Sequence, residues 1–284
     1  MKDLFLRPII LLAAVLFGAY PAAQERGAAR VLLAAVVDSR NRPIVALGAD
    51  DFVVEEEGRP REVLDAHVAD YPLAIVIDDG PDQGASFDAV KRAVTRFIER
   101  IGERPVAIWR LSEPDRPLAA LDAERASVLR RVSELEPRAA SQETILQAVA
   151  NAARLLVDTG TPFAAVLVIA ARTVDASQAS RRELLPEILA SGATIHALSG
   201  RVTTARDGAS GDQDILRLLA EQARGQYTTI FSTASYAVAL DRLADRLAEE
   251  MMIEYLVPRE STAADVRVGV RIPGAKVLGR GVSK

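Results

Sequence analysis

The chain has 284 residues, a formal net charge of −4 and a hydrophobic fraction of 49%, values that fit one large globular domain with room for a smaller unit. This acidic balance lacks the basic footprint of a nucleic-acid-binding protein, and the absence of cysteine excludes disulfides, thiolate catalysis and cysteine-ligated metals. With only two histidines, His67 and His196, a histidine-rich metal site is excluded as well.

The first 23 residues have the pattern of a secretory signal peptide. Lys2 and Arg7 precede an apolar run over residues 9–20, and small residues follow it at 21–23. The run is shorter than the roughly 20 apolar residues that a membrane-spanning helix needs. We therefore expect an exported protein, periplasmic or secreted, with residues 1–23 removed. The alternative is an uncleaved N-terminal membrane anchor, and no second span is predicted.

A small β unit is predicted over residues 24–70. Its strands are expected at 31–38, 51–56 and 62–68, with turns at 41–43 and 57–60. A unit of this size cannot bury enough surface to fold alone. It should therefore pack on the segments that follow it.

The stretch over residues 73–82 organises the rest of the chain. Five apolar residues, rich in Ile and Val, predict a strand that is buried on both faces. Asp78, Asp79 and Asp82 follow within five positions, and residues 86–102 have the apolar spacing of a helix. Ligands of open α/β sheets bind beyond the carboxyl ends of the strands, so this acidic loop is the candidate site.

Strands and helices then alternate as far as residue 250. Strands are predicted at 106–111, 163–170, 193–198 and 226–231, and helices at 124–135, 141–156, 180–191, 214–224 and 235–250. This alternation predicts an α/β domain over residues 71–250, with a mostly parallel central sheet and helices on both of its faces. Residues 117–121 are expected to add a short antiparallel edge strand, where proline is tolerated.

The alternation of strands and helices ends at the C-terminal segment. Residues 251–284 have strand-like patterns at 252–257, 264–272 and 275–282, separated by prolines. We expect these strands to pair with the N-terminal unit, so that the two flanks of the chain form one β subdomain beside the α/β domain.

The succession of segments resembles a known family. The segments are a signal peptide, then Val-Val-Asp-Ser-Arg-Asn-Arg-Pro-Ile, Ile-Val-Ile-Asp-Asp-Gly, Val-Ala-Ile-Trp-Arg-Leu-Ser, Glu-Thr-Ile-Leu-Gln-Ala-Val and Leu-Leu-Ala-Glu-Gln-Ala-Arg-Gly-Gln-Tyr. This order is similar to exported bacterial von Willebrand factor type A (VWA) domain proteins of the kind common in Acidobacteria. The resemblance covers nearly all of the chain after residue 23. It implies a Rossmann-like domain with a metal-ion-dependent adhesion site.

The adhesion-site motif of that family is only partly present. The family has Asp-x-Ser-x-Ser after the first strand; Asp78 matches, whereas Gly80 and Asp82 replace the serines. Thr144 matches the threonine of the family, and the later aspartate falls on Ala171 or Arg172. The resemblance thus implies a degenerate site with Asp78, Asp82 and Thr144 as its remaining metal ligands. The implied partner-binding face comprises Asp78, Asp79, Gly80, Asp82, Thr144 and Arg172.

Each of these residues has two interpretations. Asp78 and Asp82 bind Mg²⁺ or Ca²⁺ together with Thr144, since hard cations take oxygen ligands, or they belong to a solvated acidic loop. Thr144 is a ligand or a helix N-cap. Arg172 forms a bidentate pair with Asp78 or Asp82 in place of a metal, or it faces solvent.

The residues favour a non-enzymatic interaction domain that binds a protein partner without a tightly held cation. The alternative is a Mg²⁺-dependent hydrolase or phosphotransferase that uses Asp78 or Asp79 as nucleophile. No histidine neighbours the acidic loop and no glycine-rich phosphate loop follows a strand, which argues against that alternative. A structural envelope protein is a third interpretation. His196, inside an apolar strand, is expected to be a core residue, and His67 a surface residue.

Overall fold

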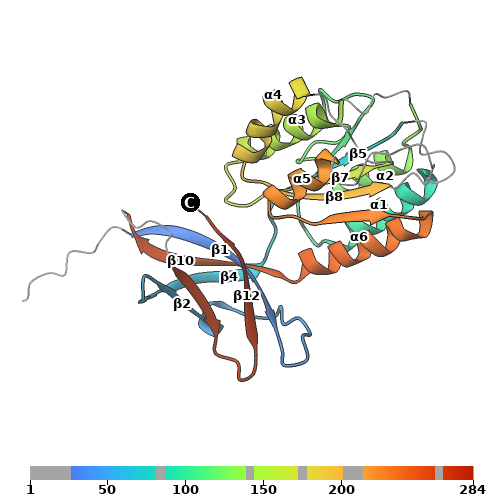
Figure 1. The fold of residues 1–284 in the computed structure, drawn as a ribbon. Helices are drawn as coiled ribbons and strands as arrows, with labels where there is room; N and C mark the ends of the chain where they lie inside the picture. Colours follow the sequence, from blue (N-terminus) through green and yellow to red (C-terminus); the bar gives the residue numbers. More distant parts are fainter. Residues whose placement is uncertain are drawn as a thin grey trace, which may run out of the picture.

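The computed structural model describes residues 27–80, 87–138, 144–171, 178–200, 214–259 and 265–283. The predicted signal peptide, Asp82 and Arg172 lie outside these residues. An α/β domain and a β subdomain lie next to each other (Figure 1). Among the helices that the structure describes, none has the length and the apolar composition needed to cross a membrane.

The α/β domain is built on a parallel five-stranded sheet with the order β6-β5-β7-β8-β9. Its strands are β5 (Leu73–Ile77), β6 (Val106–Arg110), β7 (Ala165–Ala170), β8 (Thr194–Gly200) and β9 (Tyr227–Ile230). All five side chains of β5 are buried, and the strand lies inside the sheet as its unbroken apolar sequence predicts. The predicted fold class is therefore confirmed.

The chain changes direction across the sheet at β5. After β5 it adds β6 on one side, and then β7, β8 and β9 on the other side. Ile77 is level with Arg110 of β6 and with Ile169 of β7, so these three strands end at the same edge. Asp78 therefore lies at the topological switch point, where open α/β sheets bind their ligands.

Helices cover both faces of this sheet (Figure 1). The side chains of Leu73, Ile75 and Ile77 pack against one set of helices, and those of Ala74 and Val76 pack against the other. This division follows from the two-residue period of a strand. The first set is α1 (Phe87–Arg100), α2 (Arg125–Ser133) and α6 (Thr233–Ala248); the second set is α3 (Ile145–Asp158), α4 (Gln178–Ala190) and α5 (Ile215–Gln222).

The segment predicted as an edge strand at 117–121 pairs with β6 over a shorter length than expected. Ala119 forms a single antiparallel bridge with Ile108 of β6, and its carbonyl accepts the Ile108 N–H at 2.9 Å. The direction and the place of this edge agree with the prediction. The pairing stays a bridge because Pro117 has no N–H to donate to a ladder.

The two flanks of the chain form the β subdomain, as predicted. Antiparallel pairing joins β1 to both β10 and β12, and it joins β4 to β10; a second sheet has the order β11-β2-β3. The strands are β1 (Gly27–Val37), β2 (Phe52–Glu56), β3 (Arg59–Arg61), β4 (Val63–Val68), β10 (Glu250–Pro258), β11 (Val266–Val270) and β12 (Lys276–Val282). Apolar side chains between the two sheets form a core of their own.

Several boundaries differ by a few residues from the sequence prediction, among them the start of β1 at Gly27, and two of the differences have a clear structural reason. The turn expected at 57–60 comprises only Glu57 and Gly58, which both have positive φ (54° and 71°), and residues 59–61 already form β3. Such two-residue hairpins need positive φ at both positions. The helix expected to end at residue 250 ends at Ala248, because Glu250 pairs with Ala35 as the first residue of β10.

Candidate functional site

Asp78 joins the ends of β5 and β7 at the switch point. Its side chain is 2% exposed, and both of its oxygens accept backbone hydrogen bonds. Oδ1 accepts the Gly80 N–H at 3.0 Å, and Oδ2 accepts the N–H of Ala171, directly after β7, at 2.9 Å. The carboxylate therefore connects two loops at the carboxyl edge of the sheet.

Asp79 is held by a different loop. Its Oδ1 accepts the Ser112 N–H at 2.9 Å, and its Oδ2 accepts the Ser112 hydroxyl at 2.5 Å. The backbone carbonyl of Asp79 accepts the Arg138 N–H at 2.7 Å. Asp79 is fully buried, and Ser112 supplies its two side-chain oxygens with hydrogen bonds that water would otherwise provide.

Gly80 stands so close to Asp78 that a side chain at this position would crowd the carboxylate. A Cβ atom on Gly80 would lie 3.0 Å from Asp78 Oδ1. The serine that the family has here would therefore require the carboxylate to move. Glycine permits the short N–H contact and supplies no side-chain oxygen.

Thr144 begins α3 on the same edge of the sheet. Its hydroxyl donates to the carbonyl of Leu111, the residue that follows β6, at 3.2 Å. Thr144 occupies the N-cap position, but its side chain makes no capping hydrogen bond there. The threonine thus connects α3 to the loop that also carries Ser112.

Two residues of this face were not found from the sequence. Ser112 lies two residues after the end of β6, so its place just beyond a buried strand is the sequence signal that could have identified it. Tyr236 of α6 is 4% exposed, and its pKa is raised to about 12, first by burial and then by the negative charge of Asp78. No sequence pattern connects a residue of the last helix with the acidic loop.

The described residues near Asp78 can be compared with the ligand set of a divalent cation. No group of three or more aspartate, glutamate or histidine side chains is placed to hold a metal in the described ranges. Asp78 and Asp79 accept hydrogen bonds from separate sets of donors, and Gly80 has no side-chain oxygen to coordinate a metal. Asp82 and Arg172 lie outside the described residues, so the predicted pair between Arg172 and Asp78 or Asp82 stays a prediction.

A ring of charged side chains flanks the acidic loop. Glu113 forms ion pairs with Arg110, with Arg116 at 2.9 Å and with Arg138 at 2.9 Å. The side chains of Arg116 and Arg138 are 76% and 54% exposed. These arginines lie next to Asp79, since Arg138 also donates its N–H there.

A second buried polar cluster lies at the end of β8. The hydroxyl groups of Ser199 and Tyr227 both donate to Asp214 Oδ2, at 2.9 and 2.6 Å. Asp214 Oδ1 accepts the Leu216 N–H at 3.1 Å and so caps α5. This aspartate is a helix cap with hydroxyl partners.

Neither histidine belongs to the acidic loop. His196 is 2% exposed, and its Nδ1 accepts the Gln226 N–H at 3.2 Å. Burial, together with the charge of Arg246, lowers the pKa of His196 to about 3, so the imidazole is neutral. His67 is exposed and pairs with Asp65. Both placements agree with the sequence prediction.

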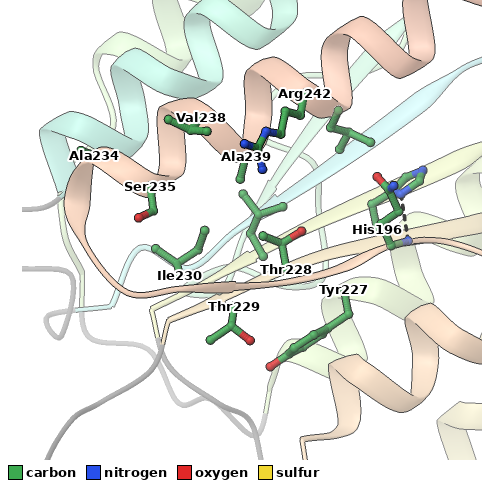
Figure 2. Close-up of a pocket in the computed structure, with 13 residues that line it drawn as sticks. His196, Tyr227, Thr228, Thr229, Ile230, Ala234, Ser235, Val238, Ala239 and Arg242 are labelled. Carbon is green, nitrogen blue, oxygen red and sulfur yellow. Dashed lines mark hydrogen bonds between the residues drawn. The ribbon is translucent and has the colours of Figure 1, made fainter. Parts of the chain in front are cut away.

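A groove of about 650 Å³ lies between β9, the outermost strand of the sheet, and α6. Figure 2 shows Thr228 and Thr229 of the strand on one side of the groove, with Ser235 and Arg242 of the helix on the other. His196 is at one end. The groove is lined by hydroxyl and apolar groups and does not reach Asp78.

No family model matches the chain, and no curated protein matches it in sequence. Solved structures similar to it include a von Willebrand factor type A protein from Catenulispora acidiphila, with 14% identity and a TM-score of 0.48; the match covers 89% of this chain and 72% of that one. Another is the vWF domain of the type V pili tip protein Mfa5 from Porphyromonas gingivalis, with 9% identity, 63% and 96% of the two chains covered, and a TM-score of 0.46. A third is the conserved hypothetical protein BatB from Bacteroides thetaiotaomicron, with 14% identity, 63% and 98% covered, and a TM-score of 0.43.

Von Willebrand factor type A domains are thus among the solved structures similar to this chain, in line with the resemblance seen in its sequence. The Acidobacteria-type branch stays a prediction. With identities of 9–14% and TM-scores below 0.5, the functions of these proteins have no bearing on this chain.

Proposed function

We propose that this chain is a non-enzymatic protein-interaction domain that binds a protein partner through the face around Asp78. The observation that supports it most is the double backbone anchoring of Asp78, which connects the loops after β5 and β7 at the switch point. Asp79 anchors the loop after β6 in the same way through Ser112. The carboxylates thus act as fixed supports for a loop face, and pre-organised loops lower the entropic cost of binding.

The exposed arginines beside this face supply polar contacts for the partner. Arg116 and Arg138 surround Glu113 at the rim, and arginine is enriched at protein interfaces. Neither one is needed for the core, because both guanidinium groups are mostly exposed. A charge reversal here changes the surface while leaving the fold intact.

The partner test is affinity capture from envelope extract, with wild type and two charge reversals. Arg116→Glu should lose the captured partner. Arg42→Glu is the matched control, because Arg42 is also exposed and also pairs with one carboxylate, that of Asp38, but it lies in the β subdomain. Equal capture by all three proteins, or equal loss in both variants, would refute the proposed face.

We further propose that the face works without a tightly held divalent cation. The anchoring of Asp78 and the absent side chain at Gly80 support this proposal, and a predicted pair between Arg172 and Asp78 or Asp82 would add a fixed positive charge. A metal that binds only the folded state stabilises it by about 2.7 kcal/mol at a hundredfold excess over the dissociation constant. We therefore expect the same melting temperature in millimolar Mg²⁺, in millimolar Ca²⁺ and in chelator. A saturable rise that disappears in Asp78→Ala would restore the conventional metal site.

The enzymatic alternative finds little support in the described residues. His196 is buried in β8 and binds the Gln226 N–H, and His67 lies on β4, so neither histidine is placed as a general base for Asp78 or Asp79. A phosphatase assay with added Mg²⁺ should show no turnover above buffer. Activity that is lost in Asp79→Asn would establish the hydrolase instead.

We also propose that the protein acts outside the cytoplasm, which rests on the pattern of residues 1–23. Expression of the whole chain in a Gram-negative host, followed by fractionation and N-terminal sequencing, tests this. A new N-terminus near residue 24 in the periplasmic fraction is expected. Full-length chain in the membrane fraction would identify an uncleaved anchor instead.

A further inference from the structure

A small cavity lies where the α/β domain meets the β subdomain. Its volume is about 40 Å³. The α/β domain contributes Arg224, which follows α5, and Arg246 of α6; the β subdomain contributes Glu250 of β10 and Arg280 of β12. Anything bound in this cavity would contact both parts of the molecule.

The charges around this cavity do not balance. Three guanidinium groups line it, together with one carboxylate, that of Glu250. That carboxylate is already engaged, since it accepts the Tyr71 hydroxyl at 2.6 Å and lies 3.7 Å from the buried guanidinium of Arg104. Arg104 in turn stacks on the Tyr71 ring at 4.0 Å and donates to the carbonyl of Leu247 at 2.7 Å. The negative charge of Glu250 acts on Arg246 and Arg280 as well as on Arg104, so a single carboxylate faces several guanidinium groups and the cavity keeps a net positive charge.

These three arginines also lack protein acceptors. The guanidinium groups of Arg224, Arg246 and Arg280 make no hydrogen bond or ion pair in the structure described for this chain. The Nε atoms of Arg246 and Arg280 are buried away from solvent. Arg224 Nη1 reaches the backbone of β12, 3.7 Å from where a Cβ on Gly281 would lie. The donors of two domains thus converge on a cavity whose one carboxylate, that of Glu250, is hydrogen-bonded to Tyr71 and not to them.

Such an arrangement is costly unless an anion is present. Burial and then the charge of Arg280 lower the pKa of Arg246, and the opposing effects of Glu250 and Tyr71 only partly offset this lowering. Arg224 is exposed, but the Nε atoms of Arg246 and Arg280 are buried without an acceptor, and buried unpaired donors and like charges that are partly removed from water destabilise a fold. The neighbouring His196 gives no relief, since it is neutral and uses its Nδ1 to accept the Gln226 N–H.

We propose that this junction cavity binds a small inorganic oxyanion, phosphate or sulfate, between Arg224, Arg246 and Arg280. The planar fork of arginine matches the oxygen geometry of such anions and binds them with two parallel hydrogen bonds. A water needs roughly 10–15 Å³ of such space, so the cavity holds about three water-sized groups, which suits a free oxyanion and excludes a nucleotide or a peptide. The bound anion would fasten the β subdomain to the α/β domain.

Isothermal titration calorimetry of the full chain with inorganic phosphate tests this proposal. The buffer is acetate at constant ionic strength, and sulfate and chloride serve as second and third titrants. We expect one phosphate per chain, competition by sulfate and a saturable rise in melting temperature. Arg246→Gln and Arg280→Gln should each weaken binding at least about tenfold, the effect of losing one charge-assisted hydrogen bond.

Arg242→Gln is the matched control. Arg242 lies one turn before Arg246 on the same helix, but it is exposed and lines the neighbouring groove (Figure 2). Its substitution should change phosphate affinity less than about twofold, because a surface charge at this range is screened by salt. In acetate alone, Arg280→Gln should melt no lower than wild type, since it removes a repulsive charge; in saturating phosphate it should melt lower.

Several results would overturn the proposal. They are no saturable binding, equal weakening by Arg242→Gln and Arg246→Gln, or chloride binding that phosphate does not displace. If Arg246→Gln fails to fold, Arg280→Gln on the edge strand β12 and Arg224→Gln on the exposed residue decide the question. Partner capture by the Asp78 face is expected to be the same in these variants, so the two proposals fail independently.

Discussion

Protonation of the buried His196 should lower the free energy of unfolding by an amount that can be measured. Its Nδ1 accepts a backbone N–H, and its pKa is lowered to about 3 by burial and by Arg246. The unfolded chain has an ordinary histidine with a pKa of about 6.5. Between these two values the unfolded state binds more protons than the folded state, so stability falls as the pH decreases.

His196→Leu should therefore flatten the pH dependence of stability between pH 6.5 and the acid limit of folding. The wild type should lose up to about 1.4 kcal/mol of unfolding free energy per pH unit more than the variant. Urea unfolding at a series of pH values measures this difference. His67→Leu is the matched histidine-to-leucine substitution at an exposed site and shows what the substitution itself does to stability. A wild-type slope equal to that of His196→Leu would mean that the imidazole is charged in the fold.

At the residue scale, the sequence predicted which acidic side chains gather at the switch point but not what holds them. Asp78 and Asp79 were placed correctly by the apolar run before them, because the end of a buried strand is visible in a sequence. The N–H groups of Ala171 and Ser112 that bind them come from strands far along the chain. A backbone donor has no residue type to recognise, and its position depends on the pairing of β5 with β6 and β7.

At the scale of elements, a buried ion pair connects the two sheets of the β subdomain. Arg30 of β1 pairs with Glu56 of β2, whose side chain is fully buried, and Arg61 Nε lies 3.4 Å from the other oxygen of Glu56. Removing one member of a buried pair leaves an uncompensated charge, whereas removing both costs less.

Glu56→Ala should destabilise the protein by about 3–5 kcal/mol, and Glu56→Ala combined with Arg30→Met should recover part of that loss. Urea unfolding of the two variants measures both effects. Glu187→Ala is the control, since its pair with Arg154 is about half exposed on each side and should contribute less than about 1 kcal/mol. A double variant that is less stable than Glu56→Ala would show that the pair is not the main interaction here.

The elements themselves were largely predictable, and their ends were not. The positions of β5 to β9 followed from apolar runs and helical spacing, whereas the end of α6 depended on Glu250, which pairs as a strand residue and binds Tyr71. Gly225 was predicted to end a helix. In the structure Arg224 takes the positive φ of 59°, and Gly225 is required because a Cβ there would lie 1.7 Å from the Ile195 carbonyl oxygen. Such a contact depends on tertiary packing.

For the whole molecule, the flanks of the chain depend on each other. β1 pairs along its length with β10 and with β12, so most of its backbone partners come from the last 35 residues of the sequence. From the sequence, this pairing of the two flanks was predicted only because each flank is too small to fold alone. The domain boundaries at residues 70 and 250 stay predictions.

Deleting residues 257–284 should expose the N-terminal unit as well as the tail. β1 would lose β12 and the end of β10, and β2 would lose β11. Limited proteolysis should then cut within residues 27–68 at protease concentrations that leave the wild type intact. Fragments from the α/β domain serve as the internal reference. Unchanged resistance of residues 27–68 would show that the pairing with the tail contributes little to their stability.

The pairing of β1 with β10 and β12 also constrains the order in which the parts of the chain can fold. The first described strand leaves the ribosome more than 200 residues before the strands that complete its sheet. The α/β domain, whose strands follow each other closely in the sequence, can fold during this time. The backbone N–H and C=O groups of β1 stay without these strand partners until β10 and β12 have been synthesised. Exposed strand edges of this kind are sites of aggregation, and late long-range pairing is slow. The last step of folding is therefore a closure between the two ends of the chain, and it is the step at which chaperone assistance has the most to protect.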